Sequence, residues 1–262
     1  MDKIEFINYT NQAKKIYSNY GRNDEFKQIE FLIISTRNPK YCYNFARSVE
    51  GADVQKLGEV VIKYGNPELN LQFANIAGAD TIKHRETIIQ SKDVKANIEA
   101  SIKIKDEHYL AYVERHGEIV LSYGNMYNIY QYLKYNYKRG LKTERYFNKI
   151  EQEGGNYFNT KVAKEIKNAD VKRHGKVVID SKDGVANCVF AQIEGADTFK
   201  HEQIVLDLKD ESLSLMFVKS VKNCNIQAHK EIIMNGDNVE IKQEFIDWLT
   251  TNNKNNYTEF GR

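Results

Sequence analysis

A ten-residue segment recurs along this chain and limits the folds available to it more than any other feature. The clearest copy is LGEVVIKYGN at 57–66, and close copies begin at residues 84, 116, 174 and 201. Weaker copies begin at 29 and 229, so most neighbouring copies start 27–32 residues apart, and one interval, from 116 to 174, is 58 residues long. A period in this range is typical of proteins that stack one small unit many times. The sequence therefore predicts a repeat protein.

The first half of each repeat has the pattern of a helix. In the second repeat, Val54, Leu57 and Val61 fall at i, i+3 and i+7, which places them on one helix face. Asp53 stands just before this face, where its carboxylate can accept hydrogen bonds from the free backbone N–H groups of the first turn. We expect the same N-cap role in the other repeats for Asp80, Asp170, Asp197 and Asn225.

The second half of each repeat predicts another helix. Pro39 and Pro67, the only two prolines, follow Asn38 and Asn66, and proline is tolerated at the first position of a helix. The repeats then end at residues suited to a left-handed turn, namely Gly51, Gly78, Asn168 and Gly195. We therefore expect an all-α fold: an α-solenoid of about eight helical hairpin repeats of roughly 27 residues, with terminal capping helices.

Several second helices carry the pattern Phe-Ala-x-x-Ile/Val-x-Gly-Ala-Asp, or the same pattern with one residue fewer after Phe-Ala, and lead into a helix with an Ile-Ile or Val-Ile pair. In this pattern, over about residues 29–240, the chain resembles the short HEAT-like α-helical repeats found in proteins of phages and low-GC bacteria. The resemblance implies an α-solenoid. It brings no catalytic residue, because such arrays serve many roles.

The repeat pattern divides the chain into four regions. Residues 1–28 have a helical spacing without the turn signals of the repeat, so we expect an N-terminal capping helix there. Residues 29–125 and 170–262 hold regular repeats, and the second of these regions ends in a C-terminal cap in which Trp248 closes the last core layer. Residues 126–169 form an irregular region, rich in Tyr and Lys, with room for a degenerate repeat.

The charge and the cysteine content limit the partners and the cellular compartment that we expect for the chain. The 38 Lys and Arg residues against 36 Asp and Glu leave a formal charge of +2, too small to indicate nucleic acid or an anionic membrane by itself. Cys42, Cys188 and Cys224 form no CxxC pair, so we expect these cysteines to be reduced and to pack as small core residues. A reducing compartment fits this cysteine content best. The sequence has no signal-peptide pattern and no apolar run long enough to span a bilayer. We expect a cytoplasmic protein with no membrane contact.

Five of the six histidines occupy one repeat position: His84, His116, His174, His201 and His229. The same position holds Leu57 in the second repeat and Ile29 in the first, so it belongs to the edge of the core. Neighbouring helices pack about 8–10 Å apart, whereas the ligands of one zinc ion all lie about 2 Å from it. We therefore expect packed histidines that are hydrogen-bonded to the adjoining repeat, with no metal bound, and we expect His174→Leu to be tolerated.

Familiar catalytic motifs are missing from the sequence. It contains no GxGxxG, GxxxxGK[ST], HExxH or GxSxG segment. Paired acidic residues occur only where a solvated helix face or a cap is expected. The sequence therefore predicts a protein that is not an enzyme and that needs no cofactor.

The irregular region contains the segment 126–149, MYNIYQYLKYNYKRGLKTERYFNK, in which aromatic and basic residues alternate. Gly140 separates two expected helices at 126–138 and about 142–152, and Gly154 and Gly155 break the chain again. Departures from a repeat often lie on the binding face. The candidate binding residues are Tyr130, Lys134, Tyr135, Tyr137, Lys138, Arg139, Lys142 and Arg145.

Three interpretations fit this segment. Its five tyrosines between 127 and 137 spread around a whole helix, so several must pack between repeats, which can leave only a solvated basic face. Tyr and Arg are also enriched at protein interfaces. Rings that stack on bases beside cations that meet phosphates suit single-stranded nucleic acid. We expect charge reversal at Lys138, Arg139 and Lys142 to weaken partner binding while stability is unchanged.

Taken with the missing motifs, these features predict a non-enzymatic module that binds a protein partner. The resemblance implies a narrower role, that of a phage or mobile-element protein that binds and inhibits a host factor. One alternative is a repeat protein that binds nucleic acid through residues 126–149. Another is a hydrolase or glycosylase on a HEAT-like scaffold, which would need a carboxylate or histidine in a pocket. The sequence indicates no oligomeric state.

Overall fold

The fold is all-α, as the sequence predicts. The computed structural model describes residues 1–103 and 109–258, and within these residues regular secondary structure consists of seventeen α-helices and one short 3-10 helix. The chain divides into two compact units, Met1–Leu141 and Lys142–Arg262. The boundary between the units lies inside the irregular region 126–169.

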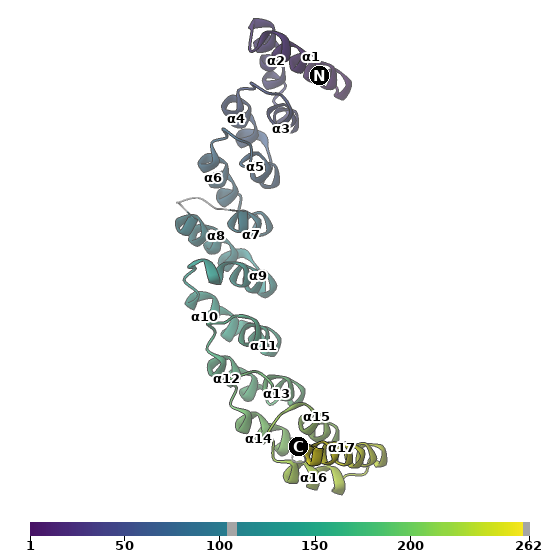
Figure 1. Ribbon diagram of the computed structural model, residues 1–262. Helices are drawn as coiled ribbons and strands as arrows, with labels where there is room; N and C mark the ends of the chain where they lie inside the picture. The colour runs from purple at the N-terminus through teal and green to yellow at the C-terminus, as the bar shows by residue number, and fades with distance from the viewer. Residues whose placement is uncertain (104–108, 259–262) are drawn as a thin grey trace. The chain divides into compact units, whose positions relative to one another are not determined.

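The first unit begins with one helix that precedes the paired helices. Its helices are α1 (Lys3–Tyr20), α2 (Asp24–Ser35), α3 (Pro39–Ser48), α4 (Val54–Tyr64), α5 (Pro67–Phe73), α6 (Thr81–Ser91), α7 (Val94–Lys103), α8 (Tyr109–Tyr123), α9 (Met126–Asn136) and η1 (Tyr137–Arg139). In this unit each helix packs against the next one along the chain and against the next but one. The helices α2, α4, α6 and α8 therefore form one row and α3, α5, α7 and α9 the other (Figure 1).

The second unit repeats this arrangement. Its helices are α10 (Glu144–Glu153), α11 (Gly155–Glu165), α12 (Val171–Ser181), α13 (Gly184–Phe190), α14 (Thr198–Leu208), α15 (Glu211–Ser220), α16 (Ile226–Asn235) and α17 (Val239–Thr258). Contacts join α12, α14 and α16 into one row and α11, α13, α15 and α17 into the other. We call the members of the first row in each unit first helices and those of the second row second helices.

Side-chain caps begin the helices where the sequence places them. The Asp53 carboxylate accepts a hydrogen bond from the backbone N–H of Lys56 at 3.1 Å, and Asp170 accepts one from Arg173 at 3.1 Å. Pro67 occupies the first turn of α5 behind the cap Asn66. The same N-cap contact is made by Asn38, Asp80, Asp197 and Asn225.

The helix ends confirm the sequence prediction only in part. Gly51, Gly78 and Gly195 have φ values of 75°, 85° and 86°, in the left-handed region that glycine reaches without strain. Asn168 does not adopt a positive φ, so that expectation was wrong. Three left-handed lysines that end first helices were not expected from the sequence: Lys92, Lys182 and Lys209, with φ of 59°, 55° and 53°.

The N-terminal and central regions differ in detail from their predicted boundaries. Helix α1 ends at Tyr20, and Asn23 already caps α2, so residues 1–28 are not one helix. The carboxamide oxygen of Asn23 accepts a hydrogen bond from the backbone N–H of Phe26, and this cap begins α2 before residue 28. In the central region the expected helix at 126–138 is α9 followed by η1, and the one at 142–152 is α10. The predicted break at Gly154 and Gly155 separates α10 from α11.

A histidine–asparagine contact joins consecutive hairpins inside both units. In the second unit, Nδ1 of His174 on α12 lies 2.7 Å from Oδ1 of Asn159 on α11. Nδ2 of Asn159 donates to the carbonyl oxygens of Ile150, at 3.1 Å, and Gly155, at 2.8 Å. The amide nitrogen is thus occupied, so Asn159 offers its oxygen to the imidazole and Nδ1 of His174 is the donor. The other three His–Asn pairs are His84–Asn70, His116–Asn97 and His201–Asn187, at 2.7, 2.7 and 2.6 Å.

These histidines are fully buried and neutral at neutral pH. Burial lowers the pKa of His84 to about 4 and, together with the charges of Arg85 and Arg115, lowers the pKa of His116 to about 3. Burial also lowers the pKa of His201 to about 4. The prediction of packed, hydrogen-bonded histidines is therefore confirmed for these four histidines. Leucine at these positions is not equivalent, because it would leave the asparagine oxygen buried without a donor.

Inside the two units, two of the described hairpin junctions lack the His–Asn pair. In one of them both residues are replaced, and in the other only the asparagine is. Cys42 stands at the asparagine position of α3 and Leu57 at the histidine position of α4, and both lie in one buried apolar cluster. In the last pair, Ser214 replaces asparagine opposite His229. Within the described residues, the Oγ of Ser214 and Nδ1 of His229 are buried and have no hydrogen-bond partner. Nε2 of His229 lies 3.3 Å from the Glu202 carboxylate.

The remaining core assignments agree with the sequence. Burial raises the pKa of the Cys42 and Cys188 thiols to about 12, so both stay protonated at neutral pH, and burial raises the pKa of Cys224 as well. Trp248 packs against the last buried cluster, beside Phe245. These residues serve packing.

Candidate functional site

The second helices present a repeated set of side chains to solvent. If each second helix is numbered so that its buried asparagine is position 4, then positions 2, 6 and 9 lie on the opposite side of the helix, because one turn takes 3.6 residues. On α11 these positions hold Tyr157, Lys161 and Lys164, and on α13 the first two hold Val185 and Val189. The fold therefore fixes which side chains of this row meet solvent.

Apolar side chains gather on this face of the second unit, where α11 and α13 pack side by side. Tyr157 is 63% exposed, Val185 55% and Val189 40%, although all three belong to helices whose opposite side is buried. They line a groove of about 400 Å³ between the two helices, with Ala186 at its floor. Large apolar side chains that lie together and exposed mark interaction sites more often than isolated ones do.

A second hollow of about 480 Å³ continues this groove toward the C-terminal ends of the same helices. Both hollows are lined by Thr160, Lys164 and Val189, so the two hollows adjoin. The continuation adds the apolar side chains of Ile166 and Ile193. We call the two hollows together the α11–α13 groove.

Lysines border the groove on the α11 side. Nζ of Lys161 lies 3.2 Å from the Glu165 carboxylate and 5.7 Å from the centre of the Tyr157 ring. Lys164 and Lys167 are exposed, and neither has an ion pair or hydrogen bond from its ammonium group within the part of the chain that the structure describes. The rim of the groove therefore presents two ammonium groups that no contact within the described residues neutralises.

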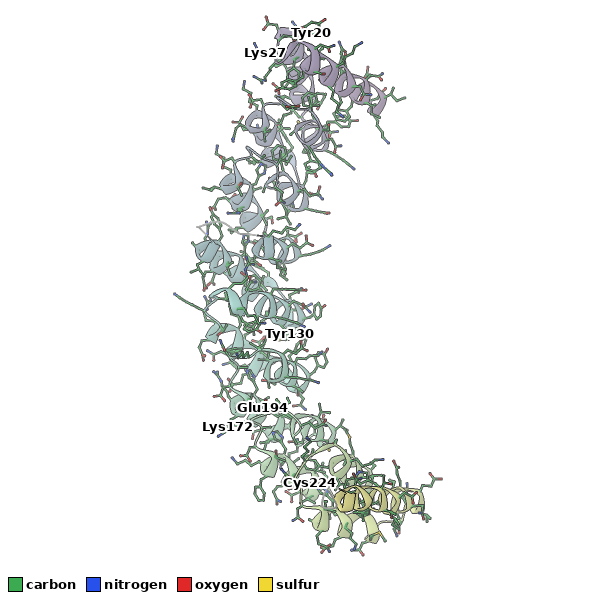
Figure 2. All side chains as sticks on the ribbon, in the orientation of Figure 1. Tyr20, Lys27, Tyr130, Lys172, Glu194 and Cys224 are labelled. Atoms are coloured by element: carbon green, nitrogen blue, oxygen red, sulfur yellow. The ribbon has the colours of Figure 1, made fainter. Side chains whose placement is uncertain are left out.

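Three of the described acidic side chains line the groove, and two of them, Asp183 and Glu194, lie toward its ends. The carboxylate of Asp183 caps α13 and accepts from the backbone N–H of Ala186 at 3.0 Å. Glu194 follows α13 in the turn beyond its other end and is labelled in Figure 2. Between the ends, the charge of the groove is set by the lysines of α11, since Glu165 is paired with Lys161.

Only some of the residues predicted from the Tyr- and Lys-rich segment are exposed. Tyr130, labelled in Figure 2, is only 4% exposed on α9, and its ring centre lies 5.8 Å from Nζ of Lys134. Lys134 and Tyr135 are exposed on the same helix. Tyr137 is half-buried in η1, with Nζ of Lys138 5.5 Å from its ring centre.

Arg139 has a structural role that the sequence did not indicate. Its Nη1 donates to the carbonyl oxygens of Ser101, at 2.9 Å, and Ile102, at 3.1 Å, in the last turn of α7. These carbonyls have no partner within their own helix, and the helix dipole favours a cation there. The expectation that charge reversal at Arg139 would leave stability unchanged therefore needs correction. Lys142 and Arg145 are exposed but belong to the second unit.

The α11–α13 groove was not predicted from the sequence, because its residues do not form an unusual segment of the chain but occupy an unusual position in the repeat. The signal was present in the register of the repeat. Position 2 of the second helices is Lys40, Glu68 and Lys95 in the first three repeats, Tyr127, Tyr157 and Val185 in the next three, and Ser212 in α15. Apolar residues at a position that the first three repeats keep charged would have indicated the groove.

The described residues contain neither a cluster of metal-ligating side chains nor a helix that could span a membrane. Across residues 1–103 and 109–258, no three His, Cys, Asp or Glu side chains are grouped as metal ligands. Of the helices described, none is both long and apolar enough to cross a bilayer. Comparisons of the chain with protein-family models, with curated proteins and with solved structures found no match. The function must be inferred from the chain's own residues.

Proposed function

We propose that the chain is a non-enzymatic α-solenoid that binds a protein partner through the α11–α13 groove. The solenoid consists of eight helical hairpins in chain order, from α2–α3 to α16–α17, behind the capping helix α1. Two rows of helices in each unit and the recurring His–Asn pair support this architecture. Each hairpin buries its apolar side only by packing on its neighbours, which is the physical basis of a solenoid.

The observation that carries the binding proposal is the apolar centre of the groove with its charged border. Tyr157, Val185 and Val189 are exposed at the centre, and Lys161 and Lys164 stand beside them. Protein interfaces have this anatomy, with an apolar centre depleted in charge and a polar rim. Folding of the unit does not require these three side chains to face solvent, so recognition explains them better than stability does.

Binding without catalysis fits the chemistry of the groove and of the core. The histidines of the His–Asn pairs are buried and already hydrogen-bonded, and the thiols of Cys42 and Cys188 are held protonated. The described residues that line the groove are mainly aliphatic side chains, lysines and carboxylates, and they include no histidine or cysteine. We also propose, more narrowly, that the protein is cytoplasmic. A phage or mobile-element origin and the inhibition of a host factor are two further proposals that rest on the HEAT-like resemblance alone.

Nucleic-acid binding is the second candidate, and one observation favours it. Tyr127 and Tyr135 are 57% and 50% exposed on α9, where Lys134 is also exposed, and Lys138 is exposed on the following η1. Exposed rings beside lysines suit stacking on bases and contact with phosphates. The aliphatic centre of the α11–α13 groove suits bases less well, so we rank a protein partner first.

Photo-crosslinking in the cell that makes the protein tests the proposal while the partner is still unidentified. A photoreactive phenylalanine is placed at position 189 in the groove or, as a control, at the exposed position 176 on α12. We expect a discrete adduct from position 189 that protease removes and nuclease does not. Adducts that nuclease removes would favour the second candidate, and equal adducts from both positions would contradict the assignment of the groove.

A further inference from the structure

We infer that the α11–α13 groove receives an acidic amphipathic helix of the partner, which lies along the groove with its apolar side on α13 and its carboxylates toward the lysines of α11. This inference rests on the proposed function and adds the chemistry of the partner. Three features of the described residues lead to it: the spacing of the apolar groups, the unpaired lysines and the secondary structure of the surface.

The apolar groups are spaced for a helix. Val185 and Val189 are four residues apart on α13, which places them about 6 Å apart along one side of that helix. A helix lying alongside would meet them with its own residues at i and i+4, since both helices have the same pitch. Tyr157 lines the same groove from α11.

The groove is long enough for several turns of such a helix. The two hollows share Thr160, Lys164 and Val189 and together follow α11, which has 11 residues and a length of about 16 Å. A ligand helix of about three turns therefore fits the groove. That length presents three to four apolar residues on one side, as in other helix-in-groove complexes.

The unpaired lysines determine the sign of the ligand charge. Lys164 and Lys167 lack carboxylate partners in the described residues, whereas Lys161 is engaged by Glu165. Asp183 is committed to the cap of α13, and Glu194 lies beyond the end of that helix. Carboxylates on the ligand would meet the lysines without displacing an existing ion pair. Such complementarity mainly fixes orientation and accelerates association.

The secondary structure of the surface excludes the main alternative for a peptide ligand. An extended segment binds strongly when it adds a strand to a sheet edge, where free backbone groups supply the hydrogen bonds. The described part of this unit is helical, and α11 and α13 satisfy their backbone groups internally. The groove therefore offers only side chains for binding. A helical ligand makes its backbone hydrogen bonds internally, so it leaves the fewest backbone groups without partners when it binds.

Peptide display on the whole chain tests this inference directly. Random peptides of about 15 residues, which span about 20 Å as helices, are selected on the wild-type protein. Survivors are then sorted on three variants: Val189→Asp, the double variant Lys164→Glu/Lys167→Glu, and the control Lys176→Glu on α12. Circular dichroism and the melting temperature establish that each variant is folded.

We expect enriched peptides with a net negative charge and apolar residues at i, i+4 and i+7. Their binding should weaken more than about tenfold on Val189→Asp and on the double lysine variant and remain unchanged on Lys176→Glu. Selection repeated on the double lysine variant should enrich basic peptides instead. This reversal of charge is the sharpest expected result.

The possible failures distinguish the inference from the proposed function. Neutral or basic peptides that still require Val189 would overturn the acidic helix and leave the groove as the binding surface. Acidic peptides without a helical apolar spacing would overturn the helical form. No enrichment, or binding that Val189→Asp does not affect, would overturn the inference, and in the second case the groove itself would also be excluded.

Discussion

Nδ1 of His174 lies 2.7 Å from Oδ1 of Asn159, and this one contact ties α12 to the second helix of the preceding hairpin. Nδ2 of Asn159 in turn donates to the carbonyl oxygen of Ile150 on α10. Two side chains thus connect three helices through the buried interior. Because the pair recurs in both units, changing one member affects stability in a way that burial alone would not predict.

The His–Asn pair predicts a coupled response to mutation. We expect His174→Leu to destabilise the protein by about 1–3 kcal/mol, since it leaves the Asn159 oxygen buried without a donor. The double variant His174→Leu/Asn159→Cys copies the natural combination of Leu57 and Cys42. Its loss should be smaller than the sum of the two single losses by about 0.5–3 kcal/mol. Urea unfolding of the four proteins gives the coupling, and simple additivity would contradict it.

Stability should depend on pH through the buried histidines. Unfolding returns their pKa to about 6.5, whereas burial holds the pKa of His84 and His201 at about 4. Between these values the unfolded chain binds more protons, so the stability present above about pH 6.5 falls as the pH drops toward 4. We expect the free energy of unfolding to be clearly lower at about pH 5 than at about pH 7.5.

A paired variant is the control for this pH dependence. The double variant His84→Leu/Asn70→Cys removes one histidine and places a weakly polar thiol beside the new leucine. The decrease in the free energy of unfolding toward low pH should therefore be smaller than in the wild-type protein. A decline equal to that of the wild-type protein would show that other groups cause it.

The contact of Arg139 with α7 predicts unequal effects of two adjacent residues. Arg139→Glu removes two hydrogen bonds to the carbonyls of Ser101 and Ile102 and places a negative charge at the C-terminal end of a helix. We expect a loss of about 1–3 kcal/mol in the free energy of unfolding. Lys138→Glu, in the same turn but exposed, should cost less than about 0.5 kcal/mol. Equal effects of the two substitutions on thermal unfolding would contradict the capping role.

The left-handed lysines predict a stabilising substitution. Lys182 ends α12 with φ of 55°, a conformation that is strained for any residue with a Cβ atom. Lys182→Gly should therefore raise the free energy of unfolding by up to about 1 kcal/mol, after allowance for the greater freedom of glycine in the unfolded chain. Lys176→Gly, in the exposed interior of the same helix, should lower it by about 1 kcal/mol. A loss of stability in both variants would show that the αL strain is negligible.

Local chemistry explains which structural features could be predicted from the sequence. Asp53, Asp170 and Pro67 reveal helix starts because capping depends on the residue and its immediate neighbours. The αL conformation of Lys182 was not predictable, because lysine has no preference for it and the turn between α12 and α13 imposes it. The spacing of the histidines showed one shared environment, but their asparagine partners are 14 to 19 residues away and were not identified.

The candidate site shows the same division between local and tertiary information. A cluster of Tyr and Lys in sequence suggested a binding surface, yet Tyr130 is buried and Arg139 caps another helix. The α11–α13 groove combines Tyr157 with Val185 and Val189, which are separated by about one repeat and meet only when the hairpins stack. Such a site becomes visible from sequence only when repeats are compared position by position.

The most direct test of the central claim is the affinity of the crosslinked partner for wild-type protein and for Val185→Asp/Val189→Asp, measured by isothermal titration calorimetry. We expect the two carboxylates to weaken binding by more than about tenfold, equivalent to about 1.4 kcal/mol, with the melting temperature nearly unchanged because both side chains are exposed. Lys176→Glu should bind as the wild-type protein does. An unchanged affinity of the double variant would contradict the claim that this groove is the binding surface.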